Sequence, residues 1–517
     1  MKERPVVEKI QRWCLRAIAV SGTVIFAVLV SCSWFRTKTL LPSEFFEDHG
    51  DMPWKMALIF AGVIATVCVA IKAERFLSAG LLHIMAVICA AGAVIFSLYL
   101  MHGAKAYAVA DQWYVYDAAC RLAEGNFDIQ QYSGYYQFYA FQLNLAQIYE
   151  FLFRLTGSSG YEVIQVMHAI CAGITVYMGF RIVRELFCRR AAELICLILE
   201  ITFMPMYVYV LYIYGETLGT CCAMTAVWCF LKYNKCHSVR GILGYGIVGM
   251  LAAAVFYQAR VALIVVWIAM MLIQLLITWP RRNYLSLAMT FSMLIMALLM
   301  SAALRSSMEG RTGVDLDKRM PAVLWIAMGM QDSIEQGKSP GSYNGYNVSV
   351  YVQAGMDKKA SSGIAMEYLR ERIGELITHP ADAAAFFGRK IMNQWNEPTY
   401  GCFISTGFSE GMDEWVHDLY YGTGKERCLA FLNIYQGIVY FAVLLGFVRL
   451  VSGKGTPQEA LIGLILIGEF LFSMMWEAKS RYVYPYVVIM IPFAAGSLMR
   501  CGDAVLRKIK RQEADIS

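Results

Sequence analysis

The sequence predicts an all-α, polytopic membrane protein of about 12 transmembrane helices. Its composition and the recurrence of long apolar runs both indicate that class. Hydrophobic residues make up 58% of the chain and charged residues only 16%, with a mean hydropathy of +0.49. Soluble domains carry a larger share of charge. Apolar runs of roughly 20 residues, the helical length that crosses a bilayer, recur along almost the whole chain.

The apolar runs divide the chain around one long polar region. They cover residues 15–34, 54–72, 79–101, 161–181, 191–213, 216–233, 241–257, 260–279, 283–303, 428–449, 458–476 and 482–500. The predicted organisation is two extra N-terminal helices (1–78), a membrane core (79–303) with a large outer loop (102–160), a small, mostly helical extracytoplasmic domain (304–427), C-terminal helices (428–500) and a basic cytoplasmic tail (501–517).

The basic residues predict which side of the membrane each loop occupies, because Lys and Arg gather on short cytoplasmic loops. With the N-terminus in the cytoplasm, every short loop on that side is basic, as in RIVRELFCRR at 181–190 and RKIKR at 507–511. Both termini are therefore expected in the cytoplasm. The loop 102–160, the junction near Glu216 and the region 304–427 are expected on the other side.

The outer regions contain further predicted helices. Residues 135–157 are almost long enough to span, but a span there would invert the basic loops, so we expect an amphipathic helix at the interface. Within 304–427, Ser361 or Ser362 is expected to cap a helix that reaches Ile377. A second helix is expected from Pro380 to Trp395.

Two acids on the predicted outer side are candidate site residues. Asp111 follows the span 79–101 in AYAVADQWYVYDAAC, where an ordinary solvated loop acid is the simpler interpretation, since Asp117 and Asp128 lie on the same loop. Glu216 lies in YVLYIYGETLGT after Gly215, which permits a tight turn. An acid there is either hydrated at the interface or part of a convergent carboxylate pair with Asp111.

Basic residues on the same side are candidate phosphate ligands. The phrase WEAKSRYVYPY places Glu477, Lys479 and Arg481 in one short outer turn, where the positive-inside bias disfavours cations. Arg260 lies between two spans with almost no loop. Such cations can bind a lipid phosphate, and the simpler alternative is that they anchor helix ends in the headgroup layer.

Taken together, these residues resemble the GT-C superfamily of membrane glycosyltransferases, in particular bacterial, family 39-like members of the protein O-mannosyltransferase and lipid A aminoarabinose transferase type. Asp111 matches the first-loop acid of that family, Glu216 the second acid, and Trp476–Pro485 a W-E-A-x-S-R-Y-x-x-P phrase. The likeness covers residues 79–500. Departures are the two extra spans, Glu in place of Asp at the second acid, and Asp-Gln in place of an acidic pair at the first.

The resemblance implies an enzyme, an integral-membrane glycosyltransferase that moves a sugar from a polyprenyl-phosphate-linked donor, with inversion. Asp111 would be the general base. Arg481, Lys479 and Arg260 would bind the lipid phosphate. Glu216 would orient the acceptor or, with Asp111, hold a divalent cation (Mg or Mn) if one is used.

The implied partners are the lipid bilayer, the polyprenyl-phosphate sugar donor and an extracytoplasmic acceptor that is a cell-envelope glycan, a lipid or a protein, with no nucleic acid. The implied location is the plasma membrane, with the active site outside the cytoplasm. The 304–427 domain would cap the cavity. Contacts with the acceptor or the cap are expected from Glu477 and from Tyr343, Asn344 and Trp395. For Trp395 a place in the core of the domain is the simpler interpretation.

Two other functions stay open. A secondary transporter or lipid flippase would use the intramembrane acids Glu200 and Glu469 to couple ions. Against it, the sequence has no paired halves with Gly- or Pro-broken helices. A polysaccharide polymerase or ligase is also polytopic with a large outer loop, and is expected to depend on outer arginines rather than on a first-loop acid.

Overall fold

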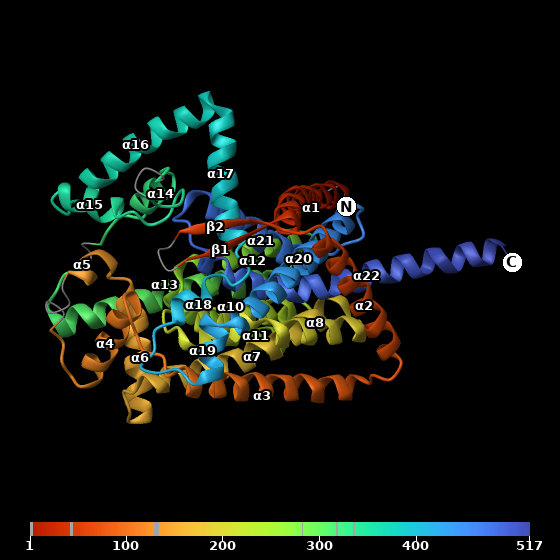
Figure 1. The fold of residues 1–517 in the computed structure, drawn as a ribbon, viewed down its shortest axis with the longest axis horizontal. Helices are drawn as coiled ribbons and strands as arrows, with labels where there is room; N and C mark the ends of the chain where they lie inside the picture. Colours follow the sequence, from red (N-terminus) through yellow and green to blue (C-terminus); the bar gives the residue numbers. More distant parts are fainter. Residues whose placement is uncertain are drawn as a thin grey trace.

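The computed structural model describes residues 4–41, 45–128, 134–281, 283–316, 319–333 and 337–516. Figure 1 shows a bundle of long helices that run in roughly the same direction, with shorter helices gathered toward one end of it and both chain termini toward the other. We call these the site end and the terminal end.

Ten helices among the described residues are long and apolar enough to cross a membrane. They are α1 (Arg4–Phe35), α2 (Trp54–Glu74), α3 (Ala79–Ala104), α7 (Tyr161–Phe187), α11 (Val239–Ala259), α12 (Ile264–Arg281) with the preceding turn η3 (Val261–Leu263), α13 (Tyr284–Thr312), α20 (Thr423–Val451), α21 (Pro457–Met475) and α22 (Tyr484–Ile516). The predicted all-α polytopic class is therefore confirmed.

The predicted spans 191–213 and 216–233 account for the difference from twelve. The first is a bent pair, α8 (Arg190–Thr202) and α9 (Met204–Val208) with the turn η2 (Tyr209–Leu211), which meet at 53°. Pro205 in the first turn of α9 lacks the amide that would continue α8. The second is α10 (Glu216–Tyr233), which is almost wholly buried among α7, α11 and α22. A helix without lipid contact need not be uniformly apolar.

One short hairpin departs from the all-helical prediction. Strand β1 (Arg36–Leu40) pairs antiparallel with β2 (Phe46–Gly50), with Arg36 opposite Gly50. The hairpin joins α1 to α2 at the site end and is held there by the amide of Lys38, which donates to the carbonyl of Asn396 at 3.0 Å. Alternating Thr residues in RTKTL favour a strand, a signal too short to compete with the flanking spans.

The first-loop helices lie at the site end. They are α4 (Asp111–Ala123), α5 (Tyr135–Tyr139) and α6 (Gln142–Thr156). The single helix expected over 135–157 is thus two helices, broken at 140–141. Phe151 and Leu155 on α6 expose 69% and 71% of their surface, which gives that helix the apolar face expected of an interfacial element.

The extracytoplasmic domain predicted at 304–427 is more compact than those bounds, because α13 continues to Thr312 and α20 begins at Thr423. We use cap domain for its helices α14 (Val323–Gly329), α15 (Tyr346–Gln353), α16 (Lys358–Thr378) and α17 (Pro380–Trp395), which share a core that includes Leu324, Tyr351, Leu369 and Phe386. Helices α18 (Cys402–Thr406) and α19 (Glu414–Tyr421) follow, and α19 packs against α3 and α20.

The two predicted cap-domain helices differ in how well their ends were placed. Helix α17 begins at Pro380 and ends at Trp395, as predicted. The N-cap of α16 is Asp357, whose carboxylate accepts from the amide of Ala360 at 2.6 Å. The prediction of Ser361 or Ser362 as the cap was wrong, because Asp357 starts the helix one turn earlier and Ser361 is buried within it.

Candidate functional site

A cavity of about 900 Å³ lies at the site end, between the α11–α12 junction, the ends of α13 and α21, the helices α5 and α6, and the cap domain. Its walls carry six cations and two acids among the described residues. The cations are Arg260, Arg305, Arg319, Lys358, Lys479 and Arg481, and the acids are Asp111 and Glu477. The predicted cations and the first-loop acid therefore come from distant parts of the sequence into one cavity.

Asp111 is the first residue of α4 and lies on the cavity wall. Its side chain keeps 42% of its surface exposed, and its Oδ2 lies 3.9 Å from the Arg481 guanidinium. The preceding residue, Ala110, has φ 49° and ψ −131°, a conformation that L residues rarely adopt. Strain of this kind persists where the surroundings fix it and gathers at functional sites.

Glu216 begins α10 directly behind this wall. Its side chain is fully buried, and its Oε1 lies 3.3 Å from Nη1 of Arg260 and 4.0 Å from Nε of Arg481. Neither oxygen accepts a hydrogen bond from the described residues. Glu216 is not among the residues that line the cavity. It therefore faces the two arginines rather than a bound molecule, unlike the acceptor contact predicted from the sequence.

A close backbone approach brings Glu216 and Arg260 together. Gly215 has φ +99°, and a Cβ there would lie 2.3 Å from the carbonyl oxygen of Ala259. Only glycine fits both the left-handed conformation and this contact. The turn expected at Gly215 is present. Gly215 and Ala259 immediately precede Glu216 and Arg260, so their close contact brings these two charged residues together.

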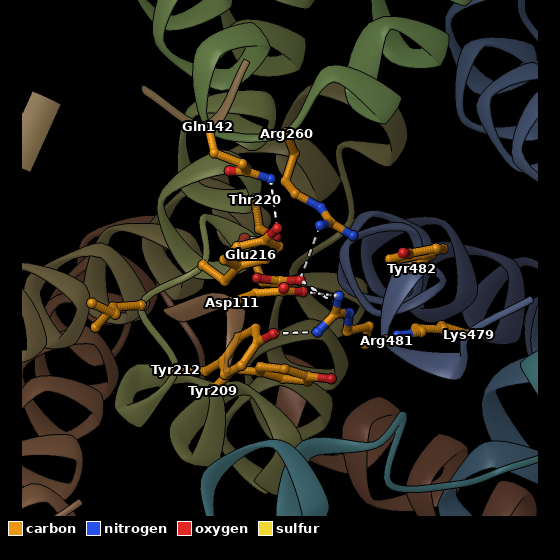
Figure 2. A network of polar contacts seen from close by, with 12 residues as sticks. Asp111, Gln142, Tyr209, Tyr212, Glu216, Thr220, Arg260, Lys479, Arg481 and Tyr482 are labelled. Carbon is orange, nitrogen blue, oxygen red and sulfur yellow. Dashed lines mark hydrogen bonds and ion pairs between the residues drawn. The ribbon is translucent and has the colours of Figure 1, made fainter. Parts of the chain in front are cut away.

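Arg481 lies in the turn η5 (Ser480–Tyr482) and points toward both acids (Figure 2). Its Nη1 donates to the hydroxyl of Tyr212, and its guanidinium lies 5.3–5.6 Å from the ring centroids of Tyr212, Tyr214 and Tyr482. Arg260 approaches Glu216 from the other side in Figure 2 and lies 4.8 Å from the Tyr482 ring. The aromatic rings and Glu216 together fix both guanidinium groups.

Lys479 and Glu477 occupy the cap-domain side of the same turn. The Nζ of Lys479 lies 3.3 Å from Oε1 of Glu477 and 5.7 Å from the ring of Tyr343, and all three residues line the cavity. Glu477 also accepts from the hydroxyl of Tyr482 at 3.0 Å. This places two of the four predicted acceptor contacts, Glu477 and Tyr343, at the cavity.

The other two predicted acceptor contacts lie elsewhere. Asn344 donates to Oε1 of Gln331 at 2.6 Å and to Oγ of Ser333 at 3.0 Å, within the cap domain. Trp395 is fully buried, and its indole nitrogen donates to Oγ of Ser473 at 3.1 Å. Neither lines the cavity. Neither side chain reaches the cavity, because both satisfy their polar groups inside the protein, and for Trp395 this agrees with the interpretation of a buried core residue.

Tyrosine and tryptophan side chains form much of the remaining wall. The hydroxyl of Tyr214 accepts from Gln142 at 2.8 Å and shares a hydrogen bond of 2.9 Å with Tyr135. Burial raises the pKa of Tyr135 and of Tyr139, so both hydroxyls stay protonated at neutral pH. Trp325 of the cap domain stacks parallel to Trp476. Aromatic faces with hydroxyl groups at their edges suit a ligand that has both apolar and polar surfaces.

Sequence reasoning missed two parts of this site. Gln112 is buried, and its Oε1 accepts from the amide of Ile213 and from the hydroxyl of Tyr161, each at 3.1 Å. It thus ties the start of α4 to the segment before Glu216. Its position directly after Asp111 was the available signal. The cavity cations Arg305, Arg319 and Lys358 had no such signal, since only the fold brings them to the cavity.

The residues at the site do not fit a divalent cation. Within the described part of the chain, no group of three or more His, Cys, Asp or Glu side chains could hold a metal ion. Both predicted ligands, Asp111 and Glu216, lie within 4.0 Å of an arginine. A guanidinium at that distance satisfies the carboxylate charge and repels a cation.

The two intramembrane acids of the transporter hypothesis lie outside the lining that the structure describes for the cavity. Glu200 and Glu469 are both buried, and neither is among the lining residues that the structure describes. Glu200 packs against Gly179, where a Cβ would lie 1.5 Å from its Oε1. Glu469 interacts electrostatically with Arg260 on the cavity wall and so lies near the site, whereas Glu200 packs against α7.

The fold and this cavity define a class, the polytopic helical membrane proteins with a polar, cation-lined cavity at one end of the bundle. Within that class the chain belongs to the family described as "Conserved hypothetical integral membrane protein", whose model matches residues 13–501. No curated protein and no solved structure matches the chain. The family establishes an integral membrane protein, and the cavity supplies the basis for a function.

Proposed function

We propose that the protein is an integral-membrane glycosyltransferase that uses a polyprenyl-phosphate-linked sugar. The observation that carries this proposal is the pairing of Asp111 with Arg481, 3.9 Å apart on the wall of one large cavity at the end of a membrane bundle. A half-exposed carboxylate next to a fixed guanidinium offers a base and an anion ligand within the reach of one substrate.

In the proposed reaction, Asp111 takes the proton from an acceptor hydroxyl as its oxygen attacks the anomeric carbon of the donor. The bond between that carbon and the phosphate oxygen breaks, and the electron pair leaves with the polyprenyl phosphate. The configuration of the anomeric carbon inverts, because attack and departure occur on opposite faces. A base positioned in this way contributes roughly 10²- to 10⁴-fold to the rate.

The leaving phosphate is assigned to the cations at the α21–α22 turn. Arg481 and Lys479 both line the cavity, and Arg260 faces it from the α11–α12 junction. Charge that develops on the phosphate oxygens is stabilised most by donors that are already fixed in place. Glu216 supports this role indirectly as a positioning residue, because its buried carboxylate holds Arg260 and Arg481.

The acceptor is assigned to the cap-domain side of the cavity, where Tyr343, Trp325 and Glu477 lie. It would be an envelope glycan, a lipid or a protein. The proposed location is the plasma membrane with the termini in the cytoplasm. The support is the distribution of basic residues in the sequence, since short loops at the terminal end are rich in Lys and Arg, as in RIVRELFCRR at 181–190.

The test is donor consumption by the purified full-length chain in proteoliposomes. A panel of radiolabelled polyprenyl-phosphate sugars is supplied with envelope extract as acceptor, and the release of polyprenyl phosphate is measured. We expect Asp111→Asn to lower release by at least about 10²-fold. The matched control is Asp117→Asn on the same helix, which removes only an ion pair with Arg121. Normal release by Asp111→Asn would refute the assignment of the base.

A polysaccharide polymerase or ligase is a second candidate, favoured by the four arginines on the cavity wall. It would also release a polyprenyl carrier, but its donor would be a lipid-linked oligosaccharide or polymer. Transfer that requires such a donor and survives Asp111→Asn would support it. Ion-driven flux that is lost on Glu200→Gln, without any donor consumption, would instead support a transporter.

A further inference from the structure

Helix α17 is fixed to the bundle at its C-terminal end. There Trp395 donates to Ser473 near the end of α21, and the side chain of Asn396 donates to the carbonyl of Arg36 at 2.8 Å, directly after α1. Because α1 and α21 are both membrane spans, α17 leaves the bundle at the level where those spans end.

From that point α17 runs sideways. Figure 1 shows it almost at right angles to the spans, so that the corner between α16 and α17 stands clear of the bundle and level with the site end of α3. Its 16 residues correspond to a length of about 24 Å at 1.5 Å per residue. The corner therefore lies beside the bundle at the level of the membrane surface.

The outer part of α16 carries an exposed apolar stripe at this corner. Met366, Ile373 and Ile377 expose 54%, 47% and 74% of their surface, and Ile377 has the largest exposed fraction among the exposed large hydrophobic side chains that the structure describes. With Arg370 they recur at i, i+4, i+7 and i+11, so they share one face of the helix. This face is distinct from the face that Leu369 and Leu376 bury against the domain core.

Charges are arranged around the stripe as in helices that lie on membranes. Exposed Arg370 is within the stripe, and exposed Lys359 lies one heptad before Met366. The exposed acids Glu367, Glu371 and Glu375 lie on other faces of α16. Basic side chains beside apolar ones can place their stems along lipid chains and their charges among phosphates.

We propose that the α16 stripe rests in the headgroup layer of the leaflet at the site end, and that phospholipid is its partner. This contact would hold the cap domain over the cavity. A second copy of the chain is a poorer occupant, because stable protein interfaces need roughly 800 Å² from each partner, far more than three side chains supply. The inference is independent of the chemistry proposed for the cavity.

The experiment places a photo-crosslinking amino acid, benzoylphenylalanine, at position 377 of the full-length chain, and separately at position 371 as the matched control. Both positions are exposed on α16 and face different ways. Each protein is reconstituted into bilayers of phosphatidylethanolamine and phosphatidylglycerol, irradiated, and analysed by intact-mass spectrometry. We expect a phospholipid adduct at 377 in at least about fivefold excess over 371.

Two results of this crosslinking experiment would overturn the proposal. One is an equal or absent lipid adduct at the two positions, and the other is a chain-to-chain adduct at 377, which would identify a second copy as the occupant. A second measurement uses Ile373→Asp with Ile377→Asp, which should leave the melting temperature in detergent unchanged, because both side chains are exposed. In bilayers the same variant should show faster hydrogen exchange across α16, and unchanged exchange there would also overturn the proposal.

Discussion

The guanidinium of Arg260 lies 3.3 Å from the carboxylate of Glu216, a side chain with no exposed surface. The same carboxylate is 4.0 Å from Arg481, so one buried negative charge is shared by two arginines. Removing one partner of a buried ion pair leaves an uncompensated charge, which is far less favourable than either the intact pair or an apolar replacement.

Replacing Glu216 with Gln should therefore destabilise the protein by roughly 3–5 kcal/mol, because Arg260 and Arg481 would face each other without their shared counter-ion. The measurement is thermal unfolding in detergent. The double variant Glu216→Gln with Arg260→Met should recover part of this loss, since one of the buried cations is gone. Equal melting temperatures for the native chain and Glu216→Gln would contradict the ion-pair account.

Gln112 provides a test of positioning next to the proposed base. In Gln112→Leu the buried amide of Ile213 loses its acceptor, which should reduce the free energy of unfolding by about 1–3 kcal/mol. Donor release should fall as well, because the start of α4 is no longer tied to the segment before Glu216. Gln137→Leu, at an exposed position on α5, is the control and should alter neither quantity. Stability lost with full donor release would limit Gln112 to a structural role.

Lys390 makes the stability of the cap domain depend on pH. It is buried in α17 and donates to the carbonyl of Gly329, and burial lowers its pKa from 10.5 to about 7. Between those values the unfolded chain binds more protons than the folded chain, so the free energy of unfolding rises with pH, by at most about 1.4 kcal/mol per unit. Below pH 7 Lys390 is protonated in both states, so it no longer makes the free energy of unfolding depend on pH.

The comparison is with Lys390→Met, which keeps the volume and cannot titrate. The melting temperature of the native chain minus that of the variant should increase from pH 7 to pH 10 and be flat from pH 5 to pH 6. Parallel curves over the whole range would show that Lys390 keeps its proton in the folded state.

The sequence was sufficient for the fold class and for the side of the bundle on which the charged residues gather. Hydropathy and the positive-inside bias placed Asp111, Arg260 and Arg481 on the same side of the membrane, because both signals are local properties of the chain. Hydropathy located α10 at 216–233 as a span, but it could not show that α10 is enclosed by other helices, because burial against neighbours is not recorded in a local apolar run. The β1–β2 hairpin was missed for a related reason, since its contact with Asn396 is made across the fold.

Side-chain roles were predicted less well than positions. The outer location of Glu216 suggested contact with a substrate, but its burial depends on how α10 packs, which no local pattern records. Asn344 was similarly expected at the cavity although it bonds inside the cap domain, whereas the core position favoured for Trp395 agrees with its burial. Arg305, Arg319 and Lys358 reach the cavity only because α13, the segment between α13 and α14, and α16 converge there. Convergence between distant elements is a property of the tertiary structure.

The close approach of Gly215 to Ala259 can be separated from its backbone conformation by a matched pair of variants. Gly215 and Gly125 have φ of +99° and +80°, but a Cβ at Gly125 meets nothing within 4 Å, whereas one at Gly215 meets the Ala259 carbonyl at 2.3 Å. Both Gly→Ala changes should cost roughly 1–3 kcal/mol from the left-handed backbone. Gly215→Ala should lose a further roughly 1–3 kcal/mol from the clash.

Gly215→Ala should also lower donor release, because the clash moves Glu216 away from Arg260 and frees the two guanidinium groups from their shared anchor. Gly125→Ala should keep full donor release at temperatures where it stays folded. The measurements are thermal unfolding and donor release on the same preparations. If the two variants lose equal stability and equal release, the backbone conformation alone matters at Gly215, and the contact with Ala259 does not set the spacing of the buried ion pair.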